Sequence, residues 1–331
     1  MKKIFIAVLA LAAVAACNKS EIVSVSEGNA IAFDNAFVDN ATKSVNDPSF
    51  TNEEGKMFND FAVYGYVEGA ELFAGVKVSK TIDNEDLDQD WKYSGTQYWI
   101  AGAKYNFAAV APFTGNWEKT AASKDGVSLS FKNNGTTDLL YAQTSEIEGK
   151  VSENTAVEFT FRHILSKVKF SFENAYNATN ATIIVRNITI TNAYKTANAA
   201  LNASETTWKD QAGELALAFG NAAVASVDAE EAFAFGTTVE SYNELLLIPG
   251  AVTDGYNVTF IVDLIIGDTL VKSYEHTATV DFTPVAGTCY AINAEINAAN
   301  IDPKNEQEPI EFTVAALPSW GNPGDVDATI N

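Results

Sequence analysis

The chain of 331 residues carries 21 basic and 43 acidic residues, so its formal net charge is −22, and 47% of its residues are apolar. That apolar share is enough for well-packed cores, and the length fits about two domains of about 150 residues each. The strong negative charge repels phosphate backbones, which excludes nucleic acid as a partner.

The first 16 residues have the layout of a secretory signal peptide: two lysines, an apolar run and then small residues up to Ala16. The run is shorter than the roughly 20 apolar residues that a membrane-spanning helix needs. Residues 14–16, directly before Cys17, resemble a bacterial lipobox. We therefore predict that the signal peptide 1–16 is cleaved and that a lipid on Cys17 anchors the mature chain to a membrane. Residues 17–29 would form the tether between the lipid and the folded part. An ordinary signal peptide followed by a chance cysteine is the alternative.

Strand patterns dominate the rest of the chain, because apolar and polar residues alternate there, as they do when one strand face is buried. The alternating sets are Val127, Leu129 and Phe131; Val157, Phe159 and Phe161; Tyr256, Val258, Phe260, Val262 and Leu264; Tyr290, Ile292, Ala294 and Ile296; and Ile310, Phe312 and Val314. Gly267-Asp268 indicates a hairpin turn, and residues 208–220 are the best candidate for a helix. We predict an all-β fold of two tandem antiparallel β-sandwich domains, transthyretin-like or Greek-key in topology.

The alternation changes phase between Phe159 and Phe172. Val157, Phe159, Phe161 and His163 share one face, whereas the apolar residues that follow occupy the other phase. A bulge or a strand that crosses between domains produces such a shift. We therefore place the domain boundary near residue 165, with domains at 30–165 and 166–331.

Residue types that carry catalysis or bind metals are scarce. His163 and His276 are the two histidines, and both lie in strand patterns rather than on a strand-to-helix turn. Alternating aspartates at 86–90 begin like a calcium loop, but the glycine and glutamate that such a loop needs are missing, so we interpret them as a solvated loop. Cys289 has no partner for a disulfide once Cys17 carries lipid, and we interpret it as a small buried apolar residue. We predict no enzymatic activity, cofactor or metal; a hydrolase with an unassigned pair of carboxylates is the alternative in that class.

Large aromatic residues gather in one part of the sequence: Trp91, Tyr93, Trp99, Tyr105 and Phe107. Because Tyr105 and Phe107 alternate as one strand face, we predict that the set fills a sandwich core. A glycan-binding aromatic platform is the alternative.

Several segments together resemble the fimbrillin family of Bacteroidota, the Mfa-like and FimA-like lipoprotein subunits of type V donor-strand pili. The segments are Trp91 to Ser94, Tyr98-Trp99, Tyr105 to Pro112, Asp138 to Ala142, Phe159 to Phe170, Leu246 to Pro249, and Phe312 to Val314 before Trp320. Their order and spacing span nearly all of the chain that follows Cys17.

The resemblance implies assembly by strand exchange, in which a subunit loses its own first strand and a neighbour's extended segment refills the groove. Ile31 and Phe33, in the segment 30–33, are the candidate self-strand residues. The resemblance implies cleavage after a basic residue at about this place, and Lys43 is the next basic residue along the chain. If the strand stays in place, the protein would instead be a cell-bound anchor or a terminal subunit.

The donor candidates are Ile310, Phe312 and Val314; the alternative is a last sandwich strand with a loose tail.

Asp268-Thr269-Leu270 resembles a short O-glycosylation motif of Bacteroidota, which makes Thr269 a candidate acceptor. The expected partners are other subunits joined head to tail, the outer membrane through the lipid, and a host glycan or protein receptor, with the protein at the cell surface in a fimbrium. The alternative function is a monomeric surface lipoprotein that binds glycan or host protein through a β-sandwich.

Overall fold

The computed structural model describes residues 29–38, 59–80, 91–150, 156–224, 228–317 and 320. The predicted signal peptide, the lipid site Cys17, the cleavage candidate Lys43 and the aspartates at 86–90 lie outside these ranges. Within them the chain is almost entirely β-structure, with one helical turn, α1 (Ala298–Ile301). The predicted all-β class is confirmed. In the described ranges no helix is long and apolar enough to cross a membrane.

The first half of the chain forms an eight-stranded sheet in the order β2-β3-β4-β1-β10-β8-β5-β9. Its strands are β1 (Phe33–Val38), β2 (Asp60–Val67), β3 (Ala70–Lys80), β4 (Trp91–Tyr93), β5 (Lys104–Ala111), β8 (Leu140–Gln143), β9 (Ile147–Glu148) and β10 (Val157–His163). Strand β2 also pairs with β5, so the sheet closes on itself. The β1–β10 pairing is parallel, whereas the other described pairings in this sheet are antiparallel.

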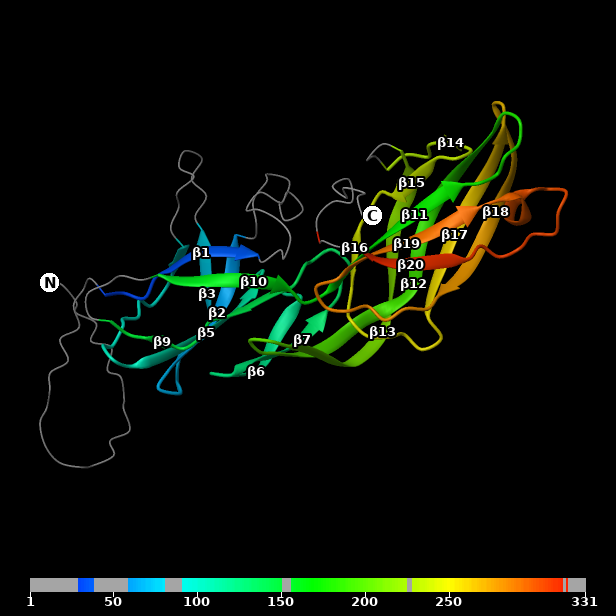
Figure 1. The fold of residues 1–331 in the computed structure, drawn as a ribbon. Helices are drawn as coiled ribbons and strands as arrows, with labels where there is room; N and C mark the ends of the chain where they lie inside the picture. Colours follow the sequence, from blue (N-terminus) through cyan, green and yellow to red (C-terminus); the bar gives the residue numbers. More distant parts are fainter. Residues whose placement is uncertain are drawn as a thin grey trace, which may run out of the picture.

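The second half, joined by a hairpin from the first half, forms a twelve-stranded sheet whose main path is β18-β17-β12-β13-β15-β11-β19-β20. The strands of this path are β11 (Ser166–Asn174), β12 (Ala181–Leu201), β13 (Thr206–Ala223), β15 (Thr238–Ser241), β17 (Tyr256–Ile266), β18 (Thr269–Val280), β19 (Cys289–Ile296) and β20 (Phe312–Leu317). Off this path lie β6 (Trp117–Ser123), β7 (Gly126–Lys132), β14 (Phe233–Ala234) and β16 (Leu245–Leu247). Figure 1 shows the two sheets as bodies placed end to end.

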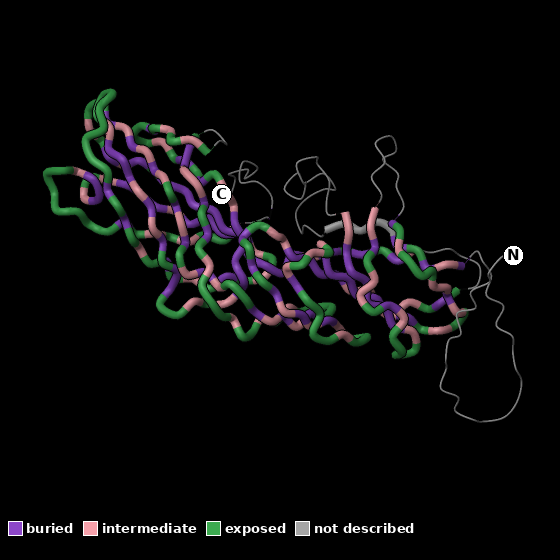
Figure 2. The backbone as a smooth tube through the Cα atoms, turned by 180° about the vertical axis from the view of Figure 1, so that it is seen from behind, coloured by how far each residue is buried: buried purple, intermediate pink, exposed green. Residues whose placement is uncertain are grey.

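The period-two patterns do become strands with one buried face. The apolar sets on β7, β10, β17 and β19 are all buried, and Gly267 forms the predicted hairpin turn between β17 and β18 with a φ of 62°. In Figure 2 the buried positions run along the inside of both bodies. Alternation therefore reports burial correctly along most of the chain.

The best helix candidate, residues 208–220, is wrong, because the segment belongs to strand β13. It pairs with β12 from Leu201↔Thr206 to Val185↔Ala222. Asp210, Gly213 and Gly220 have positive φ values, which an α-helix does not allow. The helix-forming residues between them are overridden by the long cross-strand pairing, a tertiary interaction that local propensity does not register.

The phase change is a crossing from one sheet to the other. β10 ends at His163 in the first sheet and β11 begins at Ser166 in the second, with Ile164 and Leu165 buried between them. The change of sheet thus coincides with the predicted boundary at 165. However, the hairpin β6–β7 from the first half pairs with β12 of the second sheet, so the division into 30–165 and 166–331 stays a prediction.

Candidate functional site

Strand β1 occupies what we call the β1 slot, the space between β4 and β10. Phe33 pairs with Trp91 on β4 and with Val157 on β10. Among the described strands, β1 is the one that joins β4 to β10. Because β2 and β5 close the far side of the sheet, removal of β1 would turn a closed sheet into an open one with two free edges.

Backbone hydrogen bonds hold the segment before β1 on both sides. The Ile31 amide donates to the Gln97 carbonyl at 2.8 Å, and the Val157 amide donates to the Ala32 carbonyl at 2.7 Å. The Tyr93 hydroxyl donates to the Ile31 carbonyl at 2.7 Å. Each such bond contributes about 1 kcal/mol net, and each would leave a polar group without a partner if the segment departed.

Phe33 is the centre of the aromatic core of the first sheet. Its ring lies 5.6 Å from that of Phe73, 5.4 Å from that of Tyr93 and 5.9 Å from that of Phe159, centroid to centroid. Phe33 is 3% exposed and Ile31 is 1% exposed. Burial of these two side chains contributes about 3–6 kcal/mol, so the slot binds its strand mainly by apolar contact.

The aromatic set singled out in the sequence packs in this core. Trp91, Trp99, Tyr105 and Phe107 are buried, and Tyr93 packs against them from a partly buried position. The Tyr105 hydroxyl accepts a hydrogen bond from the Ile100 amide at 2.7 Å, and burial raises the pKa of this phenol. Core packing is confirmed, and the aromatic platform for glycans is wrong because these rings face inward.

The donor candidates lie at the end of the second sheet. β20 is an edge strand, paired antiparallel with β19 alone among the described strands, from Ala294↔Phe312 to Cys289↔Leu317. Ile310 is buried before the strand begins, and the half-buried Phe312 packs its ring at 5.7 Å from that of Phe260. The structure places this segment as the last sandwich strand, and its donation to a neighbour stays a prediction.

A buried polar cluster lies where the two sheets meet. The His163 ring stacks on Trp320 with 3.8 Å between ring centroids, and its Nδ1 lies 2.7 Å from a carboxylate oxygen of Asp138. Lys167 is 7% exposed, donates to the Trp320 carbonyl and lies 2.9 Å from the Glu244 carboxylate. The sequence pattern did not reveal this cluster, because its members are up to 182 residues apart and share no local motif.

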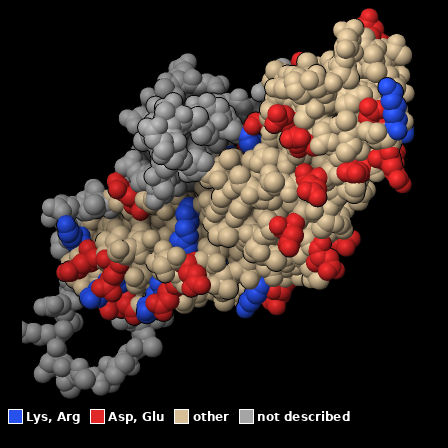
Figure 3. Space-filling view, turned by 45° about the vertical axis from the view of Figure 1, so that its right-hand side comes forward, with Lys and Arg blue, Asp and Glu red and all other residues tan. Residues whose placement is uncertain are grey.

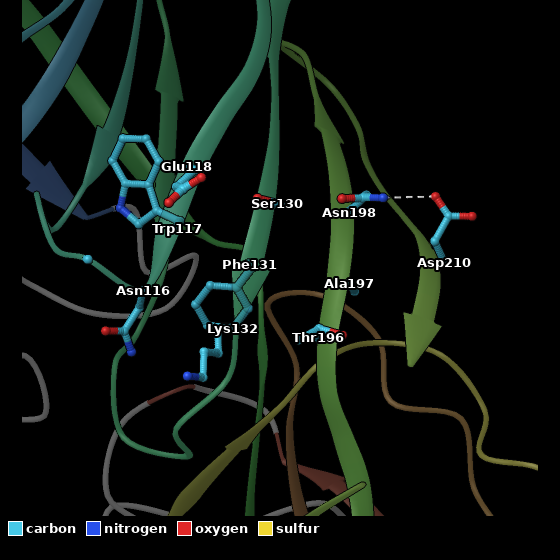
Figure 4. A pocket seen from close by; sticks show the side chains of 11 residues that line it. Asn116, Trp117, Glu118, Ser130, Phe131, Lys132, Thr196, Ala197, Asn198 and Asp210 are labelled. Carbon is cyan, nitrogen blue, oxygen red and sulfur yellow. Dashed lines mark hydrogen bonds between the residues drawn. The ribbon is translucent and has the colours of Figure 1, made fainter. Parts of the chain in front are cut away.

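A polar hollow of about 360 Å³ opens on the second sheet, where β6, β7, β12 and β13 run side by side. Figure 4 shows Asn198 reaching Asp210 on the neighbouring strand, and the two side chains are hydrogen-bonded at 2.9 Å. Lys132, Thr196 and Glu118 also line the hollow, whereas the Trp117 indole is turned inward and donates to the Pro112 carbonyl. These groups can form hydrogen bonds, but they include no nucleophile paired with a base.

The remaining candidate residues fit structural roles. His276 is buried beside Phe260, and burial lowers the pKa of its ring to about 4. Cys289 is buried, and burial raises the pKa of its thiol to about 11, which suppresses the reactive thiolate. Within the described ranges no three His, Cys, Asp or Glu side chains gather as a metal site would require.

The distribution of charged side chains on the surface fits the excess of acidic residues in the sequence. In Figure 3, acidic side chains are spread over both bodies, and the described part of this face carries no continuous basic patch. Thr269 is exposed directly after the β17–β18 turn, so its hydroxyl is accessible, while its modification stays a prediction.

Comparisons with known proteins agree with this architecture. A family model described as fimbrillin-like matches residues 41–316. A fimbrial protein from Bacteroides vulgatus has a similar structure at 15% identity and a TM-score of 0.54, over 87% of this chain and 99% of that one. A protein from Bacteroides uniformis described as a putative cell adhesion protein is similar at 17% identity and a TM-score of 0.50, over 88% of this chain and 98% of that one. At these identities the likeness shows the fold alone. No curated protein matches the chain.

The role of Phe33 in the slot is testable by truncation. Phe33→Ala should lower the free energy of unfolding by about 3–5 kcal/mol, because it empties the centre of an aromatic core. The matched control is Phe113→Ala, which removes a 41% exposed ring from the same half of the chain and should cost less than about 1 kcal/mol. Chemical denaturation of the two variants measures both values, and equal losses would contradict the central position of Phe33.

Proposed function

The chain belongs to the fimbrillin-like family, and from this premise we propose that it is a structural subunit of a cell-surface fimbrium. In the proposal the protein is exported as a lipoprotein and joins other subunits head to tail by strand exchange. Members of such a family act through assembly rather than catalysis, in keeping with the structural roles of both histidines and of Cys289.

The position of β1 is the observation that supports strand exchange best. The strand sits in the interior of a closed sheet, yet it is the first described segment of the chain and reaches β2 through residues 39–59. Lys43 lies in that connection, five residues after Val38. Cleavage after Lys43 would leave β1 bound by non-covalent contacts only.

An emptied slot is a strong acceptor. It would present the edges of β4 and β10 together with the apolar site that Ile31 and Phe33 fill. A donated strand restores the backbone pairing, and its alternate side chains enter the apolar site. Ordering the incoming strand costs about 1–2 kcal/mol per residue, so the apolar contacts decide whether exchange succeeds.

The C-terminal segment supplies the donor in this proposal. Ile310, Phe312 and Val314 alternate as Ile31 and Phe33 do. Among the described strands β20 pairs with β19 alone, so its release breaks one pairing. Donor and slot are different surfaces of one chain, so the contact is heterologous. Such a contact need not close into a ring, and its open repetition builds a filament.

The lipid on Cys17 completes the proposal, because two or more acyl chains hold a protein stably on the outer membrane before assembly. The mass of the chain extracted from cell envelopes tests it: we expect loss of residues 1–16 and a mass increase that fits acylation of Cys17. Cys17→Ser should abolish both the acylation and membrane association. An unacylated native chain would contradict the anchor.

Strand exchange is tested with a chain that starts at Asn18 and carries a single protease site placed at Lys43. After cleavage we expect the nicked protein to bind a peptide of residues 308–317 and to form ladders of oligomers, because β1 can now leave. The uncut protein is the control and should stay monomeric. A peptide with Phe312→Asp is the matched control ligand and should not bind. A nicked protein that neither oligomerises nor binds the native peptide would contradict the proposed function.

A further inference from the structure

Trp320 fills a site that we call the Trp320 seat, formed by His163 and Lys167. The indole stacks on the His163 ring with an interplanar angle of 14°, and the Lys167 ammonium lies 5.6 Å from the indole centroid. Trp320 is 5% exposed, so the seat removes almost the whole indole from water. Stacking, cation–π attraction and burial all act on one side chain.

The seat continues the β1 slot along the same strand. β1 runs parallel to β10 from Phe33↔Val157 to Val38↔Phe161. His163 is the last residue of β10, two positions beyond Phe161. A strand that follows the path of β1 a little further therefore arrives beside His163.

The spacing of the C-terminal segment matches this path. Val157 and His163 are six residues apart, and so are Val314 and Trp320. Residues opposite each other on neighbouring strands point to the same face of the sheet. A donor that runs parallel to β10, with Val314 in the position of Phe33, thus brings its Trp320 indole beside the His163 ring.

The same register fills the apolar part of the slot. Phe312 takes the position of Ile31, and Val314 takes that of Phe33. Together the two incoming side chains are about one methylene smaller than the pair that they replace, a change that cores tolerate. β1 has a bulge between Asp34 and Phe37. A donor strand in the proposed register would pair with β10 without such a bulge.

We propose that the β1 slot and the Trp320 seat form one binding surface for a second copy of this chain, whose Trp320 occupies the seat. The inference rests on the proposed function and adds to it the direction and register of the donor. When a subunit donates its own segment onward, its Trp320 leaves with it, and the incoming Trp320 refills the vacated seat. Every copy in a filament then keeps both sites filled.

The test uses the nicked protein with Trp320→Ala, whose seat is empty while β20 is retained. Two peptides of residues 308–322 serve as ligands, one native and one with Trp320→Ala. We expect the native peptide to bind this protein at least about tenfold more tightly than the altered peptide, as expected for a stacked and buried indole. On nicked protein that keeps its own Trp320, the two peptides should bind within about twofold, because the seat is occupied.

Two further variants support the assignment. His163→Ala, added to the Trp320→Ala protein, should remove the tenfold preference, since the stacking partner is lost. If the Trp320→Ala protein does not fold, Trp320→Leu keeps a smaller apolar side chain at this position. This variant should still bind the native peptide more tightly than the altered one, but by a smaller factor. Circular dichroism establishes folding in each case.

The outcomes separate the inference from the function on which it rests. Binding of both peptides with equal affinity to the protein with an empty seat would overturn the seat and the register, and leave strand exchange standing. A preference for the native peptide that persists in the absence of His163 would overturn the seat as well. Failure of every peptide to bind nicked protein would overturn the proposed function itself.

Discussion

The structure depends on the way one short strand closes the first sheet. β1 pairs in parallel with β10 and antiparallel with β4, and among the described strands it alone joins the two. Phe33 places its ring among those of Phe73, Tyr93 and Phe159, so the strand that closes the hydrogen-bonding ring also fills the core. Backbone closure and apolar packing therefore depend on the same few residues. Loss of these residues alone exposes two edges and an apolar site, the condition under which another strand is bound.

The junction between the sheets joins this closed sheet to Trp320, the last described residue. His163 ends β10, and Trp320, three residues after β20, stacks on its ring. Lys167, the second residue of β11, lies just after the crossing and is held by Glu244 and by the Trp320 carbonyl. A buried charge of this kind is costly unless it is paired, and the Lys167 ammonium has partners here, which favours this position of Trp320. The first described strand and Trp320 thus both contact one strand, β10.

The sequence predicts much of this fold because alternation reports burial strand by strand. The buried faces of β7, β10, β17 and β19 follow directly from it, as does the inward position of Ile31 and Phe33. Residues 208–220 show where local propensity fails, since pairing with β12 over the length of β13 decides their structure. The parallel pairing of Phe33 with Val157, and the stack of Trp320 on His163, join residues more than a hundred positions apart. No local sequence pattern reveals which distant residues pair or stack. Cys17 and Lys43 lie outside the described residues, so the predictions for them stay predictions.

Hydrogen exchange at the Val157 amide tests the closing role of β1 most directly, because this amide donates to the Ala32 carbonyl at 2.7 Å. The measurement compares intact protein with protein from which the cleaved N-terminal segment has been removed. We expect the Val157 amide to exchange rapidly after removal, while amides in the β12–β17 pairing keep their protection. A Val157 amide that stays protected without β1 would contradict the closing role of this strand, because the sheet would then close without it.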